Sequence, residues 1–315
     1  MTDTSLLIIG AAFTPEERSR LETAHAALFA ASFAEVAALD SATRASVKAV
    51  AFKGHDAFSG ANMDLVPNLG LIANFGVGYD AIDVDAADAR GIKVTNTPDV
   101  LNDDVADLTV GMMLAYSRNL VAGHQWVMDG TWATGKALPL NRKMSGDTVG
   151  IVGMGRIGRD IADRLAAFKM DIHYHARSKK QTPDWTYHAD VVDMAKAVDW
   201  LVIAIVGGEA TRNYVGKDVL AALGPRGVVV NISRGTTVDE AALLDALEAK
   251  TIEGAALDVF LDEPTIDPRF LKLDNVHLQP HQGSGTVETR RAMAELQLAN
   301  ITAFLGGEAL VTPVN

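Results

Sequence analysis

The chain of 315 residues contains no cysteine. Without thiols it cannot form a disulfide, supply a thiolate nucleophile, or ligate zinc or an iron–sulfur cluster through sulfur. Its chemistry must therefore come from His, Asp, Glu, Lys, Arg, Ser or Thr side chains, or from a bound cofactor. The absence of thiols is compatible with any redox compartment.

Long hydrophobic runs and a basic charge balance are also missing. The longest apolar runs, such as Leu201 to Val206, have the length of a buried strand and are too short to span a membrane. The sequence begins MTDTSLLIIG, which lacks a basic leader and a cleavage site, so we expect a cytoplasmic protein without a secretory signal. The net charge of −12, from 28 Lys and Arg against 40 Asp and Glu, argues against nucleic acid or an anionic membrane as a partner.

Short apolar runs alternate with helical patterns throughout the chain, which is typical of parallel strands joined by crossover helices. The length predicts two domains. In the first hundred residues we expect a helix after Thr14-Pro15, with Leu21, Ala24 and Leu28 on its apolar face. Four strands are expected there, over residues 6–9, 47–52, 71–75 and 92–95.

A second series of strands follows the long amphipathic stretch of residues 103–121. Six strands are expected, over residues 148–152, 171–175, 200–206, 228–232, 254–259 and 275–278. Six strands with helices between them fit a dinucleotide-binding sheet. A final helix is predicted over about residues 286–305, ending at Gly306-Gly307. Its apolar face is expected to contain Ala292, Leu296, Ala299 and Ala303.

The strand expected at 148–152 leads into a glycine-rich turn with the spacing G-x-G-x-x-G, formed by Gly153, Gly155 and Gly158. An apolar run precedes these glycines and a helical pattern follows them. In such a turn the first glycine permits the sharp bend, the second lets the backbone approach a pyrophosphate, and the third lets the helix pack on the strand. The pyrophosphate then accepts hydrogen bonds from N–H groups at the helix N-terminus. The alternative is a glycine-rich turn that binds no ligand.

The end of the next strand distinguishes NAD from NADP. An NAD site usually has an acidic residue there, about twenty positions after the glycines, which binds the ribose 2′-hydroxyl. This sequence instead has Arg177, Ser178 and Lys179, and Asp171 lies at the start of the strand, too early to reach the ribose. Cations at the strand end would bind a 2′-phosphate through charge-assisted hydrogen bonds. The sequence therefore favours NADP over NAD, and the alternative is a charged loop that only contacts solvent.

Three charged residues follow three of the expected strands. Arg234 follows the strand at 228–232, Glu263 the strand at 254–259, and His281 the strand at 275–278. Ligands of an open parallel sheet bind outside the carboxyl ends of its strands, so a cation, an orienting carboxylate and an imidazole are expected together there. Each residue alone could be a surface cation, a turn carboxylate or a structural histidine. We expect no metal site, because His173 and His175 have no evident third ligand.

These motifs resemble the D-isomer-specific 2-hydroxyacid dehydrogenases over essentially the whole chain. The matching segments are VGIVGMGRIG at 149–158, NISRG at 231–235, DEAAL at 239–243, AALDVF at 255–260, DEP at 262–264, PHQGS at 280–284 and ETR at 288–290. Within that family, the Arg177-Ser178 pair and the segment GGEATR at 207–212 are most similar to NADPH-preferring glyoxylate/hydroxypyruvate reductases.

The resemblance implies an α/β fold with doubly wound parallel sheets. A Rossmann-type cofactor domain, residues 99–285, would be inserted into a flavodoxin-like substrate domain formed by residues 1–98 and 286–315. The resemblance also implies a homodimer, built mainly through the cofactor domains.

The resemblance further implies roles for particular residues. The backbone N–H groups of Val77 and Gly78 would bind the substrate carboxylate, and Lys53, at another strand end, would add positive charge. Asp258 would accept a hydrogen bond from the nicotinamide carboxamide. The other cofactor-binding positions that it implies are Thr109, Gly153, Gly155, Arg156, Ile157, Gly158, Arg177, Ser178, Lys179, Val206, Thr211, Ile232 and Gly283. Val206 replaces a proline and Gln282 a commoner apolar residue of the family, which puts substrate preference in question more than activity.

The resulting hypothesis is NADPH-dependent reduction of a small 2-oxo acid, such as glyoxylate or hydroxypyruvate, to a 2-hydroxy acid. Arg234 would clamp the substrate carboxylate and polarise the carbonyl. His281 would donate the proton and Glu263 would orient the imidazole. Two alternatives stay open: a nucleotide-sensing, corepressor-like binding module on the same fold, and an NAD-dependent dehydrogenase for another D-2-hydroxy acid.

Overall fold

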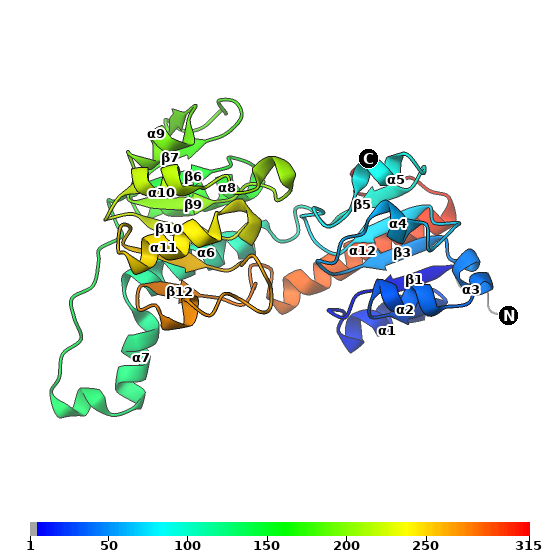
Figure 1. The fold of residues 1–315 in the computed structure, drawn as a ribbon, viewed down its shortest axis with the longest axis horizontal. Coiled ribbons are helices and arrows are strands. Elements are labelled where there is room, and N and C mark those ends of the chain that lie inside the picture. Colours follow the sequence, from blue (N-terminus) through cyan, green and yellow to red (C-terminus); the bar gives the residue numbers. More distant parts are fainter. Residues whose placement is uncertain (1–4) are drawn as a thin grey trace. The chain divides into compact units, whose positions relative to one another are not determined.

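The computed structural model describes residues 5–315. The first four residues, which belong to the expected substrate domain and to the segment predicted to have no secretory signal, lie outside the described residues. The chain divides into two compact units. Unit 1 combines Met1–Leu101 with Thr286–Asn315, and unit 2 is Asn102–Gly285. The N-terminal segment and the C-terminal helix therefore belong to the same unit (Figure 1).

Unit 1 contains a parallel sheet of five strands in the order β2-β1-β3-β4-β5. This is the flavodoxin-like strand order. The strands are β1 (Leu6–Ile9), β2 (Ala27–Ala30), β3 (Ala49–Phe52), β4 (Leu71–Asn74) and β5 (Lys93–Thr95). The helices are α1 (Pro15–Ala24), α2 (Phe33–Ala38), α3 (Ser41–Ser46), α4 (Gly60–Met63), α5 (Val84–Asp88) and α12 (Val287–Gly306). All residues of the three central strands are buried, because helices cover both faces of such a sheet.

The start of α1 is confirmed, but its predicted length is wrong. Thr14 caps the helix, and Pro15 is its first residue. The helix ends at Ala24, and Leu28 lies in the edge strand β2, where it pairs with Leu7 of β1. The ladder of hydrogen bonds with β1 favours the strand over the helical spacing of the apolar residues.

The ends of α12 are confirmed, and its predicted apolar face is correct in part, because Ala303 is buried and Ala292 and Leu296 are partly buried. The Thr286 hydroxyl accepts a hydrogen bond from the Thr289 N–H, and Gly307 follows the helix with φ = 74°. Ala299 is exposed, whereas Gln297 and Asn300 are buried. Buried polar groups need partners: Gln297 Nε2 donates to the Ala73 carbonyl at 2.8 Å, and Asn300 Oδ1 accepts from two backbone N–H groups of the C-terminal segment.

Unit 2 contains a parallel sheet of seven strands in the order β12-β11-β10-β9-β6-β7-β8. Six of them have the Rossmann order, with the switch of direction between β6 and β9, and β12 extends one edge. The strands are β6 (Thr148–Val152), β7 (Asp171–His175), β8 (Thr186–His188), β9 (Trp200–Ile203), β10 (Val228–Asn231), β11 (Gly254–Leu257) and β12 (Val276–Leu278). The helices are α6 (Asn102–Ser117), α7 (Leu120–Met128), α8 (Arg156–Ala167), α9 (Val191–Ala195), α10 (Lys217–Leu223) and α11 (Glu240–Glu248).

The α/β architecture with parallel sheets and the six strands predicted for unit 2 are confirmed. Three of the strands, β9, β10 and β11, end before the predicted residue, so the last predicted positions belong to the loops beyond the sheet. Strand β8 was not predicted. It has three residues at the sheet edge, none of them fully buried, so its sequence has no clear apolar pattern.

The predicted amphipathic stretch of residues 103–121 forms two helices, because Asn119 has a left-handed backbone (φ = 49°) between α6 and α7. No residue of α7 is buried, and Figure 1 shows this helix standing away from the sheet of its own unit. We call residues 120–140 the arm. Its exposed large apolar side chains are Leu120, Val121, Val127, Met128, Trp132 and Leu140.

Within residues 5–315, no helix is both long and apolar enough to cross a bilayer. The cytoplasmic location stays a prediction.

Candidate active site

The glycine-rich turn lies between β6 and α8. Gly153 has φ = 102°, and a Cβ atom there would lie 2.6 Å from the Ala204 carbonyl oxygen. A Cβ on Gly158 would collide with the carbonyl oxygen of Gly153, so both positions require glycine for packing. A Cβ on Gly155 would meet no atom within 4 Å. Gly155 is also the N-cap of α8 and provides no side-chain hydrogen bond to the first turn. Open space beside uncapped helix N–H groups fits a pyrophosphate.

The loop after β7 contains the basic residues proposed to recognise a 2′-phosphate. Arg177, Ser178 and Lys179 are exposed, and Lys180 Nζ donates to Ser178 Oγ at 3.5 Å. Asp171 lies at the opposite end of β7. The end of this strand therefore presents cations and a hydroxyl to solvent.

Glu263 and His281 come from the loops after β11 and β12, and they form a hydrogen-bonded pair. Glu263 Oε2 lies 2.6 Å from His281 Nδ1, and Glu263 Oε1 accepts the Phe260 N–H at 2.9 Å. The His281 backbone has φ = 54°, which is uncommon for a residue other than glycine. Its N–H donates to the Asp258 carbonyl at 2.9 Å. The loops thus fix both the backbone and the ring of His281.

Asp258 follows β11 and supports the turn after His281. Its Oδ1 accepts the Gln282 N–H at 2.6 Å, and its Oδ2 accepts the Gly283 N–H at 2.8 Å. Burial raises the pKa of the Asp258 carboxyl, although the two N–H donors oppose the shift. An acidic residue at a strand end is equally suited to such an internal capping role and to a contact with the nicotinamide.

A hydrogen-bond network also positions Arg234. Asn231 Nδ2 and the Thr237 hydroxyl both donate to the Arg234 carbonyl, at 2.9 and 2.6 Å. The Ser233 hydroxyl accepts the Arg234 N–H at 2.6 Å. A Cβ on Gly235 would collide with the Phe260 backbone, so the loop of Arg234 packs directly on the loop of Glu263. The sequence pattern did not predict positioning roles for Asn231, Ser233 and Thr237.

In unit 1, residues 75–80 follow β4 and form a loop whose carbonyl groups are occupied. Asn74 Nδ2 donates to the Gly78 carbonyl and Asn96 Nδ2 to the Val77 carbonyl, each at 2.9 Å. Among the hydrogen bonds of residues 5–315, none uses the N–H of Val77 or of Gly78 as donor. Two adjacent N–H donors in a fixed loop could bind an anion such as a carboxylate.

Known proteins resemble the chain in sequence and in fold. Residues 110–283 match the NAD binding domain of the D-isomer specific 2-hydroxyacid dehydrogenases. Glyoxylate/hydroxypyruvate reductase A of Arabidopsis thaliana is 46% identical over 274 residues, which cover 86% of each chain. The chain belongs to the D-isomer-specific 2-hydroxyacid dehydrogenase family.

Two further proteins are similar to the chain. The 2-ketogluconate reductase of Gluconobacter oxydans is 46% identical over 257 residues, 80% of this chain and 81% of that protein. The NADPH-dependent glyoxylate/hydroxypyruvate reductase of Sinorhizobium meliloti, solved in complex with NADP and malonate, is 42% identical with a TM-score of 0.93. That match covers 98% of this chain and 96% of the solved one.

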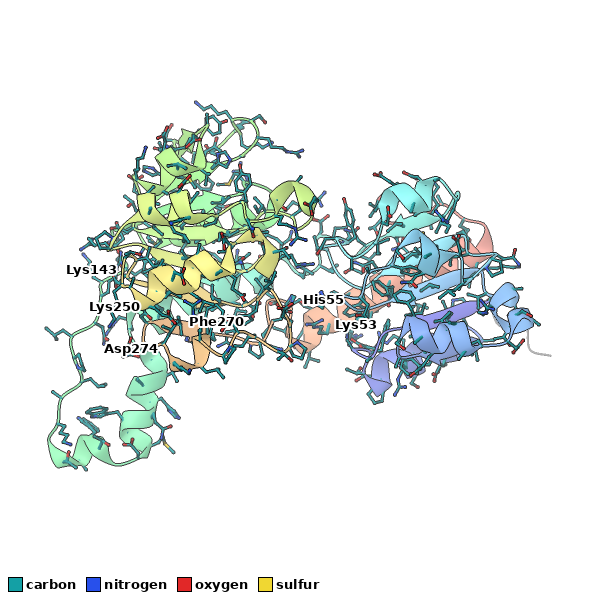
Figure 2. The ribbon with its side chains drawn as sticks, in the orientation of Figure 1. Lys53, His55, Lys143, Lys250, Phe270 and Asp274 are labelled. Atoms are coloured by element: carbon teal, nitrogen blue, oxygen red, sulfur yellow. The ribbon has the colours of Figure 1, made fainter. Side chains whose placement is uncertain are left out.

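Lys53, labelled in Figure 2, follows β3 in unit 1, and its partner was not predicted from the sequence. Its Nζ lies 2.7 Å from both carboxylate oxygens of Glu17, and 4.4 Å from the centre of the Phe75 ring. Burial lowers the pKa of Lys53, and the Glu17 carboxylate opposes this shift. Glu17 also completes the capping box of α1 with Thr14. The spacing of Thr14 and Glu17 could have predicted this capping box, but not the contact of Glu17 with Lys53.

The remaining predicted residues are placed as follows. Thr109 is buried, and its hydroxyl donates to the Val105 carbonyl at 2.7 Å. The Thr211 hydroxyl donates to the carbonyl of the exposed Val206, also at 2.7 Å. Arg156 and Ile157 begin α8, Ile232 directly follows β10, and Gly283 is buried beside the Asp258 carboxylate.

The histidines of β7 have protein partners. His173 Nδ1 lies 2.9 Å from His188 Nε2 of β8, and the two rings are stacked. His175 Nε2 lies 2.6 Å from the Tyr214 hydroxyl. Both histidines therefore hold their neighbours through hydrogen bonds, and the absence of a metal site stays a prediction.

Proposed function

We propose that the protein uses NADPH to reduce small 2-oxo acids, such as glyoxylate and hydroxypyruvate, to 2-hydroxy acids. The observation that carries this proposal is the 2.6 Å pair of Glu263 and His281, next to the loop of Arg234, at the carboxyl ends of three adjacent strands. A positioned imidazole, an orienting carboxylate and a guanidinium are the groups that carbonyl reduction requires. The names of the Arabidopsis and Sinorhizobium relatives support the substrate class.

The two units would have different tasks. Unit 2 would be the cofactor domain, since it has the glycine-rich turn and the Rossmann strand order. Unit 1 would be the substrate domain, in which the N–H groups of Val77 and Gly78 bind a carboxylate. The residue ranges predicted for these domains were 99–285, and 1–98 with 286–315.

The residues of unit 2 would divide the chemistry among them. When NADPH is bound, it supplies the hydride. Arg234 would bind the substrate carboxylate through its planar, two-pronged guanidinium and polarise the carbonyl oxygen. His281 would donate a proton to that oxygen from Nε2, because Nδ1 is bonded to Glu263. Glu263 would hold the ring orientation and stabilise the charged imidazolium.

The preference for NADPH is supported by the loop after β7. A 2′-phosphate needs cations and hydrogen-bond donors, and Arg177, Ser178 and Lys179 supply them in exposed positions. The Sinorhizobium relative was solved with NADP. NAD remains the second cofactor to test.

The arm supports the proposed homodimer. Several large apolar side chains on a helix with no buried residue form a surface that a second copy could cover. A two-fold dimer would use the same surface on both chains.

The decisive experiment measures the loss of absorbance of NADPH and NADH with a panel of 2-oxo acids that contains glyoxylate, hydroxypyruvate and 2-ketogluconate. We expect turnover with glyoxylate and hydroxypyruvate, and a higher kcat/KM for NADPH than for NADH. Binding of NADPH without turnover on any acid would contradict the proposal and favour a nucleotide-sensing module. Faster turnover with NADH would contradict the cofactor assignment.

A further inference from the structure

The backbone of the loop after β7 is held by a tyrosine from inside the sheet. Tyr174 is fully buried, and its hydroxyl forms two hydrogen bonds with one loop residue. It accepts the Lys180 N–H at 2.9 Å and donates to the Lys180 carbonyl at 3.1 Å. One buried hydroxyl therefore satisfies both backbone groups of Lys180, which fixes the loop end that follows Arg177 and Ser178.

Two other side chains hold the same loop. The Tyr187 hydroxyl of β8 donates to the Ala176 carbonyl at 3.3 Å. Arg159 of α8 donates to the Gln181 carbonyl, and its guanidinium lies 5.5 Å from the centre of the Trp185 ring. The loop backbone is thus bonded at residues 176, 180 and 181, whereas the side chains of residues 177–179 are exposed.

The end of the loop borders an open hollow of about 690 Å³ that also adjoins the glycine-rich turn. Met154 of the turn and Arg159 line it together with residues 180–183. Exposed basic side chains normally lose conformational freedom when they bind an anion. A loop already fixed in its bound conformation lowers that cost, so the same contacts give a higher affinity.

We propose that Tyr174 is a positioning residue for cofactor selection: it fixes the loop so that Arg177 and Ser178 are pre-arranged for a 2′-phosphate. This inference rests on the proposed NADP preference. Tyr174 acts through the loop and does not itself contact the nucleotide. Its hydroxyl therefore contributes to binding of the 2′-phosphate and not to the binding of a nucleotide without it.

The test is a binding experiment with two nucleotide probes, 2′,5′-ADP and 5′-AMP, measured by calorimetry on the full chain. For Tyr174→Phe we expect about tenfold weaker binding of 2′,5′-ADP, the effect of losing one buried hydrogen-bonding group, and unchanged binding of 5′-AMP. Tyr116→Phe is the matched control, because Tyr116 belongs to the same unit but packs on Gly254, at the amino end of β11. It should leave both affinities unchanged.

A double variant tests whether Tyr174 acts through the basic loop. In an Arg177→Ala background, Tyr174→Phe should weaken 2′,5′-ADP binding much less than in the wild type, since the effects of coupled residues do not add. Equal effects in the two backgrounds would overturn the inference. An unchanged ratio of the two affinities in Tyr174→Phe would also overturn it.

Two outcomes separate this inference from the proposed function. If the wild type binds 2′,5′-ADP no more tightly than 5′-AMP, the proposed NADP preference is wrong, and the inference fails with it. If Tyr174→Phe does not fold, Tyr187→Phe replaces it, because Tyr187 holds the loop at Ala176 from a partly buried position. An unchanged affinity ratio in that variant would overturn the inference while the NADP preference stands.

Discussion

His281 has a left-handed backbone that neighbouring hydrogen bonds compensate. A conformation of this kind costs roughly 1–3 kcal/mol for a residue other than glycine, and it persists where the surroundings determine it. Asp258 supplies those surroundings through its carbonyl at His281 and its carboxylate at the next two residues. A strained backbone beside a hydrogen-bonded imidazole is typical of a site in which the imidazole ring must keep one orientation.

At the residue scale, replacement of His281 should remove turnover and spare cofactor binding. His281→Asn is the suitable change, because asparagine tolerates the left-handed backbone that the turn requires. Loss of the proton donor should lower kcat by about a hundredfold or more, with the Kd for NADPH unchanged. Steady-state kinetics and a fluorescence titration of NADPH measure the two quantities. His124→Asn, an exposed histidine of the arm, is the control. Wild-type turnover in His281→Asn would remove the assignment.

Arg177→Ala tests a single charge at the cofactor loop. Loss of a charge-assisted hydrogen bond to the 2′-phosphate should weaken NADPH binding by about tenfold or more, while NADH binding changes little. The Kd values for NADPH and NADH, measured for the variant and the wild type, test this prediction. Equal losses would show that Arg177 does not recognise the phosphate.

At the element scale, the central strands were predictable, and two of the four edge strands, β2 and β8, were not. Central strands such as β6 and β10 are continuous apolar runs because they are buried on both faces. The apolar residues of β2 also fit the helical spacing of α1, and β8 has three residues of which none is buried, so neither strand has a distinct apolar pattern. The candidate site was predictable because Arg234, Glu263 and His281 follow adjacent strands. Several charged residues at one edge of a sheet are typical of a ligand site. The polar residues that hold Arg234 were missed, because Asn231 and Ser233 are equally suited to a solvent-exposed turn.

His188, at the edge formed by β7 and β8, should make the protein less stable in mild acid. Burial lowers the pKa of His188, and the neighbouring His173 and His175 add to this, while Asp193 opposes it. The unfolded chain, in which His188 has an ordinary pKa of about 6.5, therefore binds its proton more readily than the folded chain. As the pH falls through that value toward the lowered pKa, the unfolded state gains protons and the free energy of unfolding decreases.

The experiment compares urea midpoints at about pH 7.5 and pH 5.5, on either side of the ordinary histidine pKa. His188→Gln should reduce the difference between the two midpoints, although not abolish it, because burial lowers the pKa of His277 as well. Thr186→Val, an exposed change on the same strand, should keep the wild-type difference. The same difference in His188→Gln and in the wild type would disprove the role of this histidine.

At the scale of the whole molecule, the chain contains two parallel sheets of different strand order, and its ends share a unit. Length and composition predicted two domains but contained no information that the first is interrupted by the second. Only the resemblance to a family suggested that arrangement, because alternating strands and helices are compatible with many orders of the same elements. The position of the arm was likewise not predictable. Its amphipathic sequence predicted a helix, but it did not indicate that this helix stands away from the sheet of its own unit.

The exposed apolar side chains of the arm predict where two copies of the chain would associate. Its large side chains are apolar and exposed, with Met128 68% and Leu140 fully accessible, which monomeric proteins usually avoid in a contiguous set. If a second copy covers them, a charge placed there must lose its hydration on association, so Met128→Glu should shift a dimer toward monomer. Sedimentation velocity across a dilution series measures the shift. Leu271→Glu is the matched control, since Leu271 is an equally exposed apolar residue (73%) of unit 2 outside the arm. A dimer that survives in Met128→Glu as well as in Leu271→Glu would place the interface elsewhere, and a wild type that sediments as a monomer would exclude the homodimer itself.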